Sequence, residues 1–391
     1  MDEVLRDIRI RKALQQPDWP DLRQVARVRD TLAARPALVR AHDLGVLRGA
    51  LARVVAGEAM VVQVGDCAED PGECTPTDVS RKVALLDLLA GTLRMNAHKP
   101  VIRVGRIAGQ YAKPRSSGAE LVGDTHLPTF RGHMVNGPEP DEEARRPDPQ
   151  NILTCYTAAD DIMQHLGWQH SAALRDAISP PVWTSHEALL LDYEIPMLRG
   201  DGDGRVFLGS THWPWIGERT RQLDGAHVSL LAGVSNPVGC KVGPTMEPGE
   251  LLALCERLDP DREPGRLTLI SRMGADRILN RLPPLVEAVR DAGHPVIWLT
   301  DPMHGNTVTA PDGNKTRYVE TVSHEVRRFQ EAVTGADGVC GGLHLETTPN
   351  DVTECVSCEA DLAHVGDKYT TFCDPRLNPH QAVSVVSTWS V

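Results

Sequence analysis

The chain has 391 residues, 41% of them hydrophobic and 24% charged, which suits one large α/β barrel or two ordinary domains. Its formal net charge of −12 argues against a nucleic acid or an anionic membrane as partner. No apolar run is long enough to cross a membrane, and the charged N-terminus lacks the apolar centre of a signal peptide. Nine cysteines, an odd number, indicate reduced thiols and a cytoplasmic location rather than a disulfide framework.

The predicted elements begin with helices. Residues 1–55 are helical in composition, with a break around Pro17 and Pro20, and we expect them to form an N-terminal helical extension. Residues 56–391 show no further shift in composition. They are therefore predicted to form one catalytic domain.

Eight short apolar runs are predicted to be strands, and nearly every one ends in a reactive side chain. These runs are 59–64, 101–104, 181–184, 205–208, 238–242, 266–270, 295–300 and 341–345. Helices are predicted at 80–96 (with Ser80 as N-cap), 152–166, 188–198, 276–292 and 320–333, with a helix-forming stretch at 215–221 and a closing helix from 379. A Gly/Asp turn at 200–204 precedes the fourth strand. The alternation predicts an α/β fold, a (β/α)8 TIM barrel whose strand ends meet on one face.

The seventh predicted strand shows how such a face is built. Its apolar run gives way to Asp301, His304 and Asn306, and polar residues in that position form active sites at the edge of parallel sheets. The same ending recurs at other strands. The side chains expected on this face are Cys67, Arg106, Glu187, His212, Lys241, Arg272, His304 and Glu346. For any single one, the alternative is an ordinary polar residue at a strand end.

Two chemical groups separate within this set. Cys67, His304 and Glu346, with Asp374 as a further candidate, offer sulfur, nitrogen and oxygen donors that suit a borderline divalent ion. The alternative is that these residues are unrelated.

A basic group supplies donors for phosphate or carboxylate. It consists of Arg106, Lys113, Arg115, Arg219, Lys241 and Arg272. A solvated charged surface is the alternative, and it is weakest for Arg106, Lys241 and Arg272, which lie in or next to apolar runs. A metal with two anion sites indicates a reaction between phosphorylated partners, one of which offers a carbonyl for the metal to polarise.

The motifs resemble those of type II (plant-like) 3-deoxy-D-arabino-heptulosonate 7-phosphate (DAHP) synthases over residues 17–385. The matching stretches are Gly65-Asp66-Cys67-Ala68-Glu69, 106–116, Thr184-Ser185-His186-Glu187, 215–221, Ser271-Arg272-Met273-Gly274, 301–306 and Cys373-Asp374-Pro375-Arg376. The resemblance implies a condensation of phosphoenolpyruvate with erythrose 4-phosphate, the entry step of the shikimate pathway.

The resemblance also implies residue roles. The metal ligands would be Cys67, His304, Glu346 and Asp374, binding Mn²⁺ first, with Co²⁺, Fe²⁺ or Zn²⁺ as alternatives. Phosphoenolpyruvate would contact Arg106, Glu218, Arg219, Lys241 and Arg272, and erythrose 4-phosphate would contact Lys113, Arg115 and Ser116. Lys241, Glu218 and His304 would be catalytic, with Glu218 holding or deprotonating the water that adds to the enol phosphate.

Several alternatives stay open at this point. One is the amino variant of the reaction, which uses an imino sugar phosphate, and another is a silent barrel that regulates a chorismate-pathway enzyme. The chain is shorter than feedback-regulated members of the family. We therefore expect little inhibition by aromatic amino acids and a place in phenazine or another antibiotic pathway. Family habit implies a homodimer or homotetramer.

Overall fold

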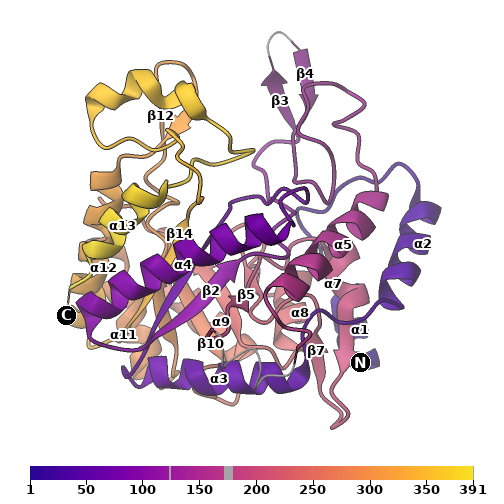
Figure 1. Cartoon of the computed structure of the whole chain (residues 1–391). Helices are drawn as coiled ribbons and strands as arrows, with labels where there is room; N and C mark the ends of the chain where they lie inside the picture. Colours follow the sequence, from indigo (N-terminus) through magenta and orange to yellow (C-terminus); the bar gives the residue numbers. More distant parts are fainter. Residues whose placement is uncertain (123–124, 171–178, 391) are drawn as a thin grey trace. The chain divides into compact units, whose positions relative to one another are not determined.

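The computed structural model describes residues 1–122, 125–170 and 179–390, and these form two compact units. Unit 1 comprises Met1–Leu44, Ala68–Val79 and Ile107–Asn236, and unit 2 comprises Gly45–Cys67, Ser80–Arg106 and Pro237–Val391. Both units contain helices and strands (Figure 1). None of the described helices is long and apolar enough to span a membrane.

Unit 2 is built on a parallel sheet. Its strands are β1 (Met60–Gly65), β2 (Val101–Arg106), β9 (Val238–Val242), β10 (Leu267–Ser271), β11 (Ile297–Thr300) and β14 (Cys340–Glu346). They lie in the order β2-β1-β14-β11-β10-β9. Gly65 pairs with Arg106 on one side and with Glu346 on the other. This register lines up the C-terminal ends of neighbouring strands, where the sequence places its polar side chains.

Gly65 is required at that position. Its φ is +151°, and a Cβ there would lie 2.5 Å from the carbonyl oxygen of Arg106. Any side chain would therefore push β2 away from β1.

Helices and short connections complete unit 2. The helices are α3 (Ala41–Val55), α4 (Pro76–Ala97), α9 (Pro248–Leu258), α10 (Ile278–Arg281), α11 (Pro283–Asp291), α12 (Val319–Gly335), α13 (Pro379–Ser387) and the 3₁₀ segment η2 (Glu359–Lys368). The first residues of α3 and α4 belong to unit 1. A hairpin pairs β12 (Val308–Thr309) with β13 (Lys315–Thr316). The predicted closing helix is confirmed as α13, which packs on α12 (Figure 1). Asn378 and Gln381 form its capping box.

Unit 1 contains helices, together with strands that are two to four residues long. Its helices are α1 (Asp2–Arg9), α2 (Leu22–Ala33), α5 (Gln150–His165), α7 (Leu191–Glu194), η1 (Ile195–Met197) and α8 (Ala226–Ala232). Its strands are β3 (Ala119–Val122), β4 (Thr125–Pro128), β5 (Trp183–Thr184), β6 (Leu198–Gly200), β7 (Val206–Leu208) and β8 (Trp215–Ile216). The helical prediction for residues 1–55 is confirmed, whereas the division into an extension at 1–55 and a single domain at 56–391 stays a prediction.

The prediction for the fourth barrel strand is wrong. Val206–Leu208 pairs antiparallel with Leu198–Gly200 in a separate hairpin. Two glycines with φ of +89°, Gly202 and Gly204, form the turn, and the Asp201 side chain accepts two backbone N–H groups within it. Trp215–Ile216, predicted to be helix-forming, is a short strand instead.

Other boundaries also differ from the prediction. The helix expected at 188–198 is only the short pair α7 and η1, because Pro196 breaks the helical hydrogen bonding. Helix α4 begins at Pro76 rather than after Ser80, and Thr75 Oγ1 accepts the backbone N–H of Asp78 at 3.3 Å. The helix expected at 276–292 is divided into α10 and α11, and Pro283 begins α11.

Candidate active site

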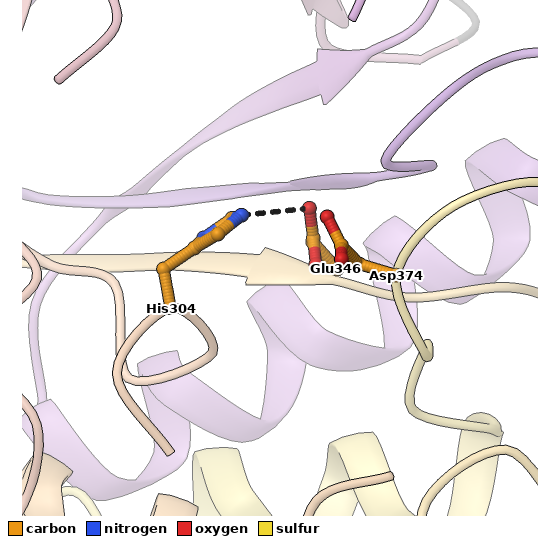
Figure 2. Close-up of side chains that lie close together, drawn as sticks. All are labelled: His304, Glu346 and Asp374. Atoms are coloured by element: carbon orange, nitrogen blue, oxygen red, sulfur yellow. Dashed lines mark ion pairs between the residues drawn. The ribbon is translucent and has the colours of Figure 1, made fainter. Parts of the chain in front are cut away.

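Three predicted metal ligands lie together in unit 2. Their donor atoms, from His304 after β11, Glu346 at the end of β14 and Asp374 before α13, all lie within 4.8 Å of one another. In Figure 2 the His304 imidazole points at the Glu346 carboxylate, with Asp374 beside it. Donors bound at about 2.1 Å lie at most about 4.2 Å apart, so a small inward movement would suffice for a divalent ion. One imidazole and two carboxylates fit such an ion chemically.

The orientation of His304 is fixed by Asp301. Nδ1 of His304 lies 2.7 Å from Asp301 Oδ2, while Nε2 lies 3.4 Å from Glu346 Oε1. The other Asp301 oxygen accepts the backbone N–H groups of Met303 and His304. A carboxylate behind an imidazole sets the ring so that its other nitrogen faces the metal position.

Asp301 also holds Lys241, which lies inside strand β9. The Lys241 Nζ is 2.5 Å from Asp301 Oδ2. Burial lowers the pKa of Lys241 to about 8, with Asp301 opposing the shift and Arg106 and Arg272 adding to it. Burial by itself would raise the pKa of Asp301, but His304 and Lys241 hold it well below its usual range. The site therefore contains a carboxylate that stays ionised and an amine that can change its charge near neutral pH.

Arg106 connects the metal-ligand cluster to a residue that sequence reasoning missed. Its Nη2 lies 3.4 Å from Glu346 Oε1, and its Nη1 lies 3.3 Å from His344 Nε2. Nδ1 of His344 faces Gln63 Oε1 at 2.7 Å. Burial, Lys241 and Arg106 together hold the pKa of His344 well below its usual range, so the neutral ring accepts from Arg106 and donates to Gln63. His344 lies two residues before Glu346 on one strand, and this spacing, which places both on one face, could have revealed it.

Cys67 lies against the same loop as Asp374. Its Sγ accepts the backbone N–H of Asp374 at 3.4 Å and lies 3.4 Å from Thr371 Oγ1. The three-residue cluster of described side chains does not include Cys67. Its role as a fourth ligand therefore stays a prediction.

A buried ion network fixes the two segments that carry Cys67 and Asp374. Nη1 of Arg376 lies 2.7 Å from Asp66 Oδ1, and its Nη2 lies 2.7 Å from Glu354 Oε1. Burial would raise the pKa of Asp66, but Lys82 and Arg376 lower it overall. Arg376 lies in the Cys373-Asp374-Pro375-Arg376 stretch, and the sequence predicted no role for it. The structure shows that it joins the end of β1 to the segment before α13.

Glu325 of α12 holds the loop that carries Arg272 in place through hydrogen bonds. Glu325 accepts the backbone N–H of Gly274 at 3.0 Å and the Asn306 side-chain N–H at 2.5 Å. Asn306 in turn accepts the backbone N–H of Ala275 at 3.0 Å. Burial raises the pKa of Glu325 to about 8, although its hydrogen bonds oppose the shift. Glu325, which the sequence reasoning missed, thus connects the loop of Arg272 to the loop of His304.

The remaining predicted residues lie in unit 1, mostly on loops. Lys113 is buried and Ser116 is exposed, while Arg115 pairs with Glu120 at 2.8 Å. Another Glu, Glu69, was missed: it accepts the backbone N–H groups of residues 108–110 at 2.7 to 3.0 Å and so shapes the chain before Lys113. No pattern within the sequence reveals that role.

Glu218 and Arg219 follow β8. Glu218 Oε1 pairs with Arg221 at 2.8 Å, and Arg219 is exposed. The Glu187 carboxylate packs on Gly217, where a Cβ would lie 2.0 Å from its Oε1. Glycine is therefore required there for Glu187 to keep its position.

His212 differs from the other candidates. It is fully buried, its Nδ1 accepts the backbone N–H of Thr184 at 3.2 Å, and its ring lies 4.0 Å from the Trp168 ring centroid. It also follows Val206–Leu208, the run that was wrongly predicted to be the fourth barrel strand. These contacts are those of a packed core histidine.

Comparisons with known proteins agree with this chemistry. A model of the Class-II DAHP synthetase family matches residues 4–180 and 161–389. The chain is 58% identical over 389 residues to a probable phospho-2-dehydro-3-deoxyheptonate aldolase of Pseudomonas fluorescens, covering 100% of this chain and 97% of that one. It is 40% identical to the phospho-2-dehydro-3-deoxyheptonate aldolase of Streptomyces coelicolor, covering 95% and 93%. A solved structure of the Francisella tularensis phospho-2-dehydro-3-deoxyheptonate aldolase superposes with a TM-score of 0.51 at 12% identity, over 99% and 94% of the chains, which is a likeness of fold.

Proposed function

The chain belongs to the class-II DAHP synthetase family, and from this premise we propose that it condenses phosphoenolpyruvate with D-erythrose 4-phosphate, giving DAHP and phosphate. The resemblance read from the sequence is thereby confirmed. The observation that carries the proposal is the cluster of His304, Glu346 and Asp374, next to the cations Arg106 and Lys241. That arrangement suits a divalent metal beside an anionic substrate.

The metal would be held by Cys67, His304, Glu346 and Asp374. The support is the donor chemistry of the three clustered residues and the carboxylate that orients His304. A mixed sulfur, nitrogen and oxygen set favours Mn²⁺, Co²⁺, Fe²⁺ or Zn²⁺ over Mg²⁺, and we propose Mn²⁺ first. When bound, the ion would polarise the aldehyde oxygen of erythrose 4-phosphate.

Phosphoenolpyruvate would bind to Arg106, Lys241 and Arg272, with Glu218 and Arg219 contributing from the segment after β8. Arg106 presents a guanidinium fork, which suits phosphate or carboxylate, and its contact with His344 orients that fork. Lys241 has a pKa of about 8 and so is mostly protonated at neutral pH. A bound dianion would hold that proton more firmly. Erythrose 4-phosphate would bind through its phosphate to Lys113, Arg115 and Ser116.

The reaction then needs three events at named atoms. C3 of the enol phosphate attacks the aldehyde carbon, positive charge develops at C2, and water adds there before phosphate leaves. Lys241 Nζ would supply a proton to the aldehyde oxygen as it gains charge. Glu218 would hold or deprotonate the added water, because its carboxylate follows the strand end on the Trp215–Ile216 segment.

We also propose that the chain forms the (β/α)8 barrel that the sequence predicts. The support is the six-stranded parallel sheet of unit 2 and the fold likeness to the Francisella tularensis structure. We further propose that the protein forms a homodimer or homotetramer. A chorismate-pathway enzyme is proposed as a partner.

The test follows phosphoenolpyruvate loss and phosphate release after erythrose 4-phosphate is added to metal-stripped protein, with and without Mn²⁺. We expect metal-dependent loss with one phosphate released per phosphoenolpyruvate. The variant His304→Ala should remain inactive with Mn²⁺. Its matched control is His364→Ala, at an exposed histidine of η2, which should keep full activity. Turnover with an imino sugar phosphate alone would reassign the aldehyde substrate, and no turnover with either would indicate a silent regulator.

A further inference from the structure

One fully buried cation, Arg317, touches all three segments that carry the clustered metal ligands. Its Nη1 lies 3.0 Å from Glu346 Oε2 and also donates to the carbonyl of Pro375, the residue after Asp374. Its Nε donates to Thr307 Oγ1 at 3.2 Å, three residues after His304. A single guanidinium therefore connects the His304, Glu346 and Asp374 segments.

The backbone around Arg317 is itself anchored. Its carbonyl accepts the backbone N–H of Val356 at 3.0 Å, and the next residue, Tyr318, forms a parallel bridge with Val356. Lys315, two residues earlier, lies 3.1 Å from Asp374 Oδ1. In extended backbone, residues i and i+2 point to the same side. The segment thus directs two cations at two carboxylates of the cluster. The buried Arg317 faces Glu346, and the half-exposed Lys315 faces Asp374.

We propose that Arg317 is a resident counter-ion of the metal-ligand cluster, which holds the cluster together in the metal-free protein and weakens metal binding. The inference rests on the proposed metal site. Without a metal, Arg317 at Oε2 and Arg106 at Oε1 together compensate the buried Glu346 carboxylate. Loss of Arg317 would leave Oε2 without its cation, at a high free-energy cost. With a divalent ion in place, that compensation is duplicated, and the fixed positive charge repels the ion.

The experiment compares the wild type with Arg317→Met and Arg317→Lys after metal stripping. Melting temperatures are measured with and without Mn²⁺, and the dissociation constant for Mn²⁺ is measured by calorimetry. For Arg317→Met we expect metal-free melting to fall by about 5 °C or more. The rise on adding Mn²⁺ should exceed that of the wild type, and Mn²⁺ should bind about tenfold more tightly. Arg317→Lys keeps the charge, so its Mn²⁺ affinity should stay near that of the wild type.

Two further variants separate charge from packing. Thr307→Val removes an anchor of Arg317 without changing charge, and should lower metal-free and metal-bound melting equally. Lys315→Met removes the half-exposed cation, and should change Mn²⁺ affinity less than about threefold because solvent screens that pair.

The outcomes are distinguishable. No melting shift of the wild type with Mn²⁺, Co²⁺, Fe²⁺ or Zn²⁺ would overturn the metal site, and with it the proposed function and the counter-ion. A normal wild-type shift that Arg317→Met reproduces unchanged would overturn only the counter-ion. If Arg317→Met fails to fold without metal, folding rescued by Mn²⁺ supports the proposal, and failure in both conditions overturns it.

Discussion

The two units hold their candidate residues in different ways. In unit 2, His304, Lys241 and Glu346 lie in or after buried parallel strands and are fixed by charged side chains, above all Asp301 and Arg317. In unit 1, the candidate residues lie mainly on loops, and Glu69 shapes the segment before Lys113 by accepting backbone N–H groups. Site chemistry should therefore be most sensitive to charge in unit 2, whereas in unit 1 it should be sensitive to loop conformation.

The largest expected effect tests the charge network of unit 2. Asp301→Asn removes the anionic partner of both His304 and Lys241. Loss of such a partner behind a metal-binding imidazole lowers metal affinity by about 10- to 100-fold, and we expect phosphoenolpyruvate turnover to fall at least as much. Calorimetry with Mn²⁺ and the phosphoenolpyruvate assay measure the two effects. Asp337→Asn, at an exposed site, is the control. Unchanged Mn²⁺ affinity in Asp301→Asn would contradict the sensitivity to charge expected of unit 2.

The second prediction concerns pH and the link between the Arg272 and His304 loops. Glu325 has a folded-state pKa of about 8, above its ordinary value of 4.5. Between these values the folded protein binds more protons than the unfolded one, so the stability contribution of Glu325 falls as pH rises.

Glu325→Gln removes this dependence. From pH 5.5 to 7.5 the wild type should lose about 2 to 3 kcal/mol relative to the variant, at about 1.4 kcal/mol per pH unit. Urea unfolding of both proteins at the two pH values measures the difference. Parallel stability curves for the two proteins would show that Glu325 does not titrate in this range.

The third prediction tests unit 1. Glu69→Gln places an amide N–H where three backbone N–H groups now donate to a carboxylate. We expect the free energy of unfolding to fall by about 2 kcal/mol, in the range found for an unsatisfied buried donor. The KM for erythrose 4-phosphate should rise as the Lys113 segment shifts. Glu142→Gln, an exposed residue of the same unit, should leave both quantities unchanged, and the same result for Glu69→Gln would refute the role of Glu69.

The smallest expected effect on stability belongs to Arg115. Its ion pair with Glu120 is partly exposed on both sides, so Arg115→Lys should change the free energy of unfolding by less than about 1 kcal/mol. If Arg115 binds a phosphate through its fork, the same change should raise the KM for erythrose 4-phosphate several-fold. An unchanged KM would remove Arg115 from that site.

Prediction from the sequence succeeded where local pattern is enough. Runs such as 60–65 and 297–300 are apolar and rich in β-branched residues, and they form buried strands as expected. The error at Val206–Leu208 has a physical cause: that run has the same local character, but pairing with Leu198–Gly200 decides its place. β8 has only two residues, too few for a periodic pattern.

The sequence by itself determined the parallel strands of unit 2, the polar residues at their ends and, through its motifs, the family. Only the tertiary structure decided which groups hold those residues in place. Arg376 reaches Asp66 across 310 positions and Arg106 reaches His344 across 238, while Arg317 binds Glu346 from outside every strand of the parallel sheet. Strand formation depends on neighbouring residues, so it can be read locally. Charge pairing in the interior depends on distant segments meeting, which no local pattern encodes.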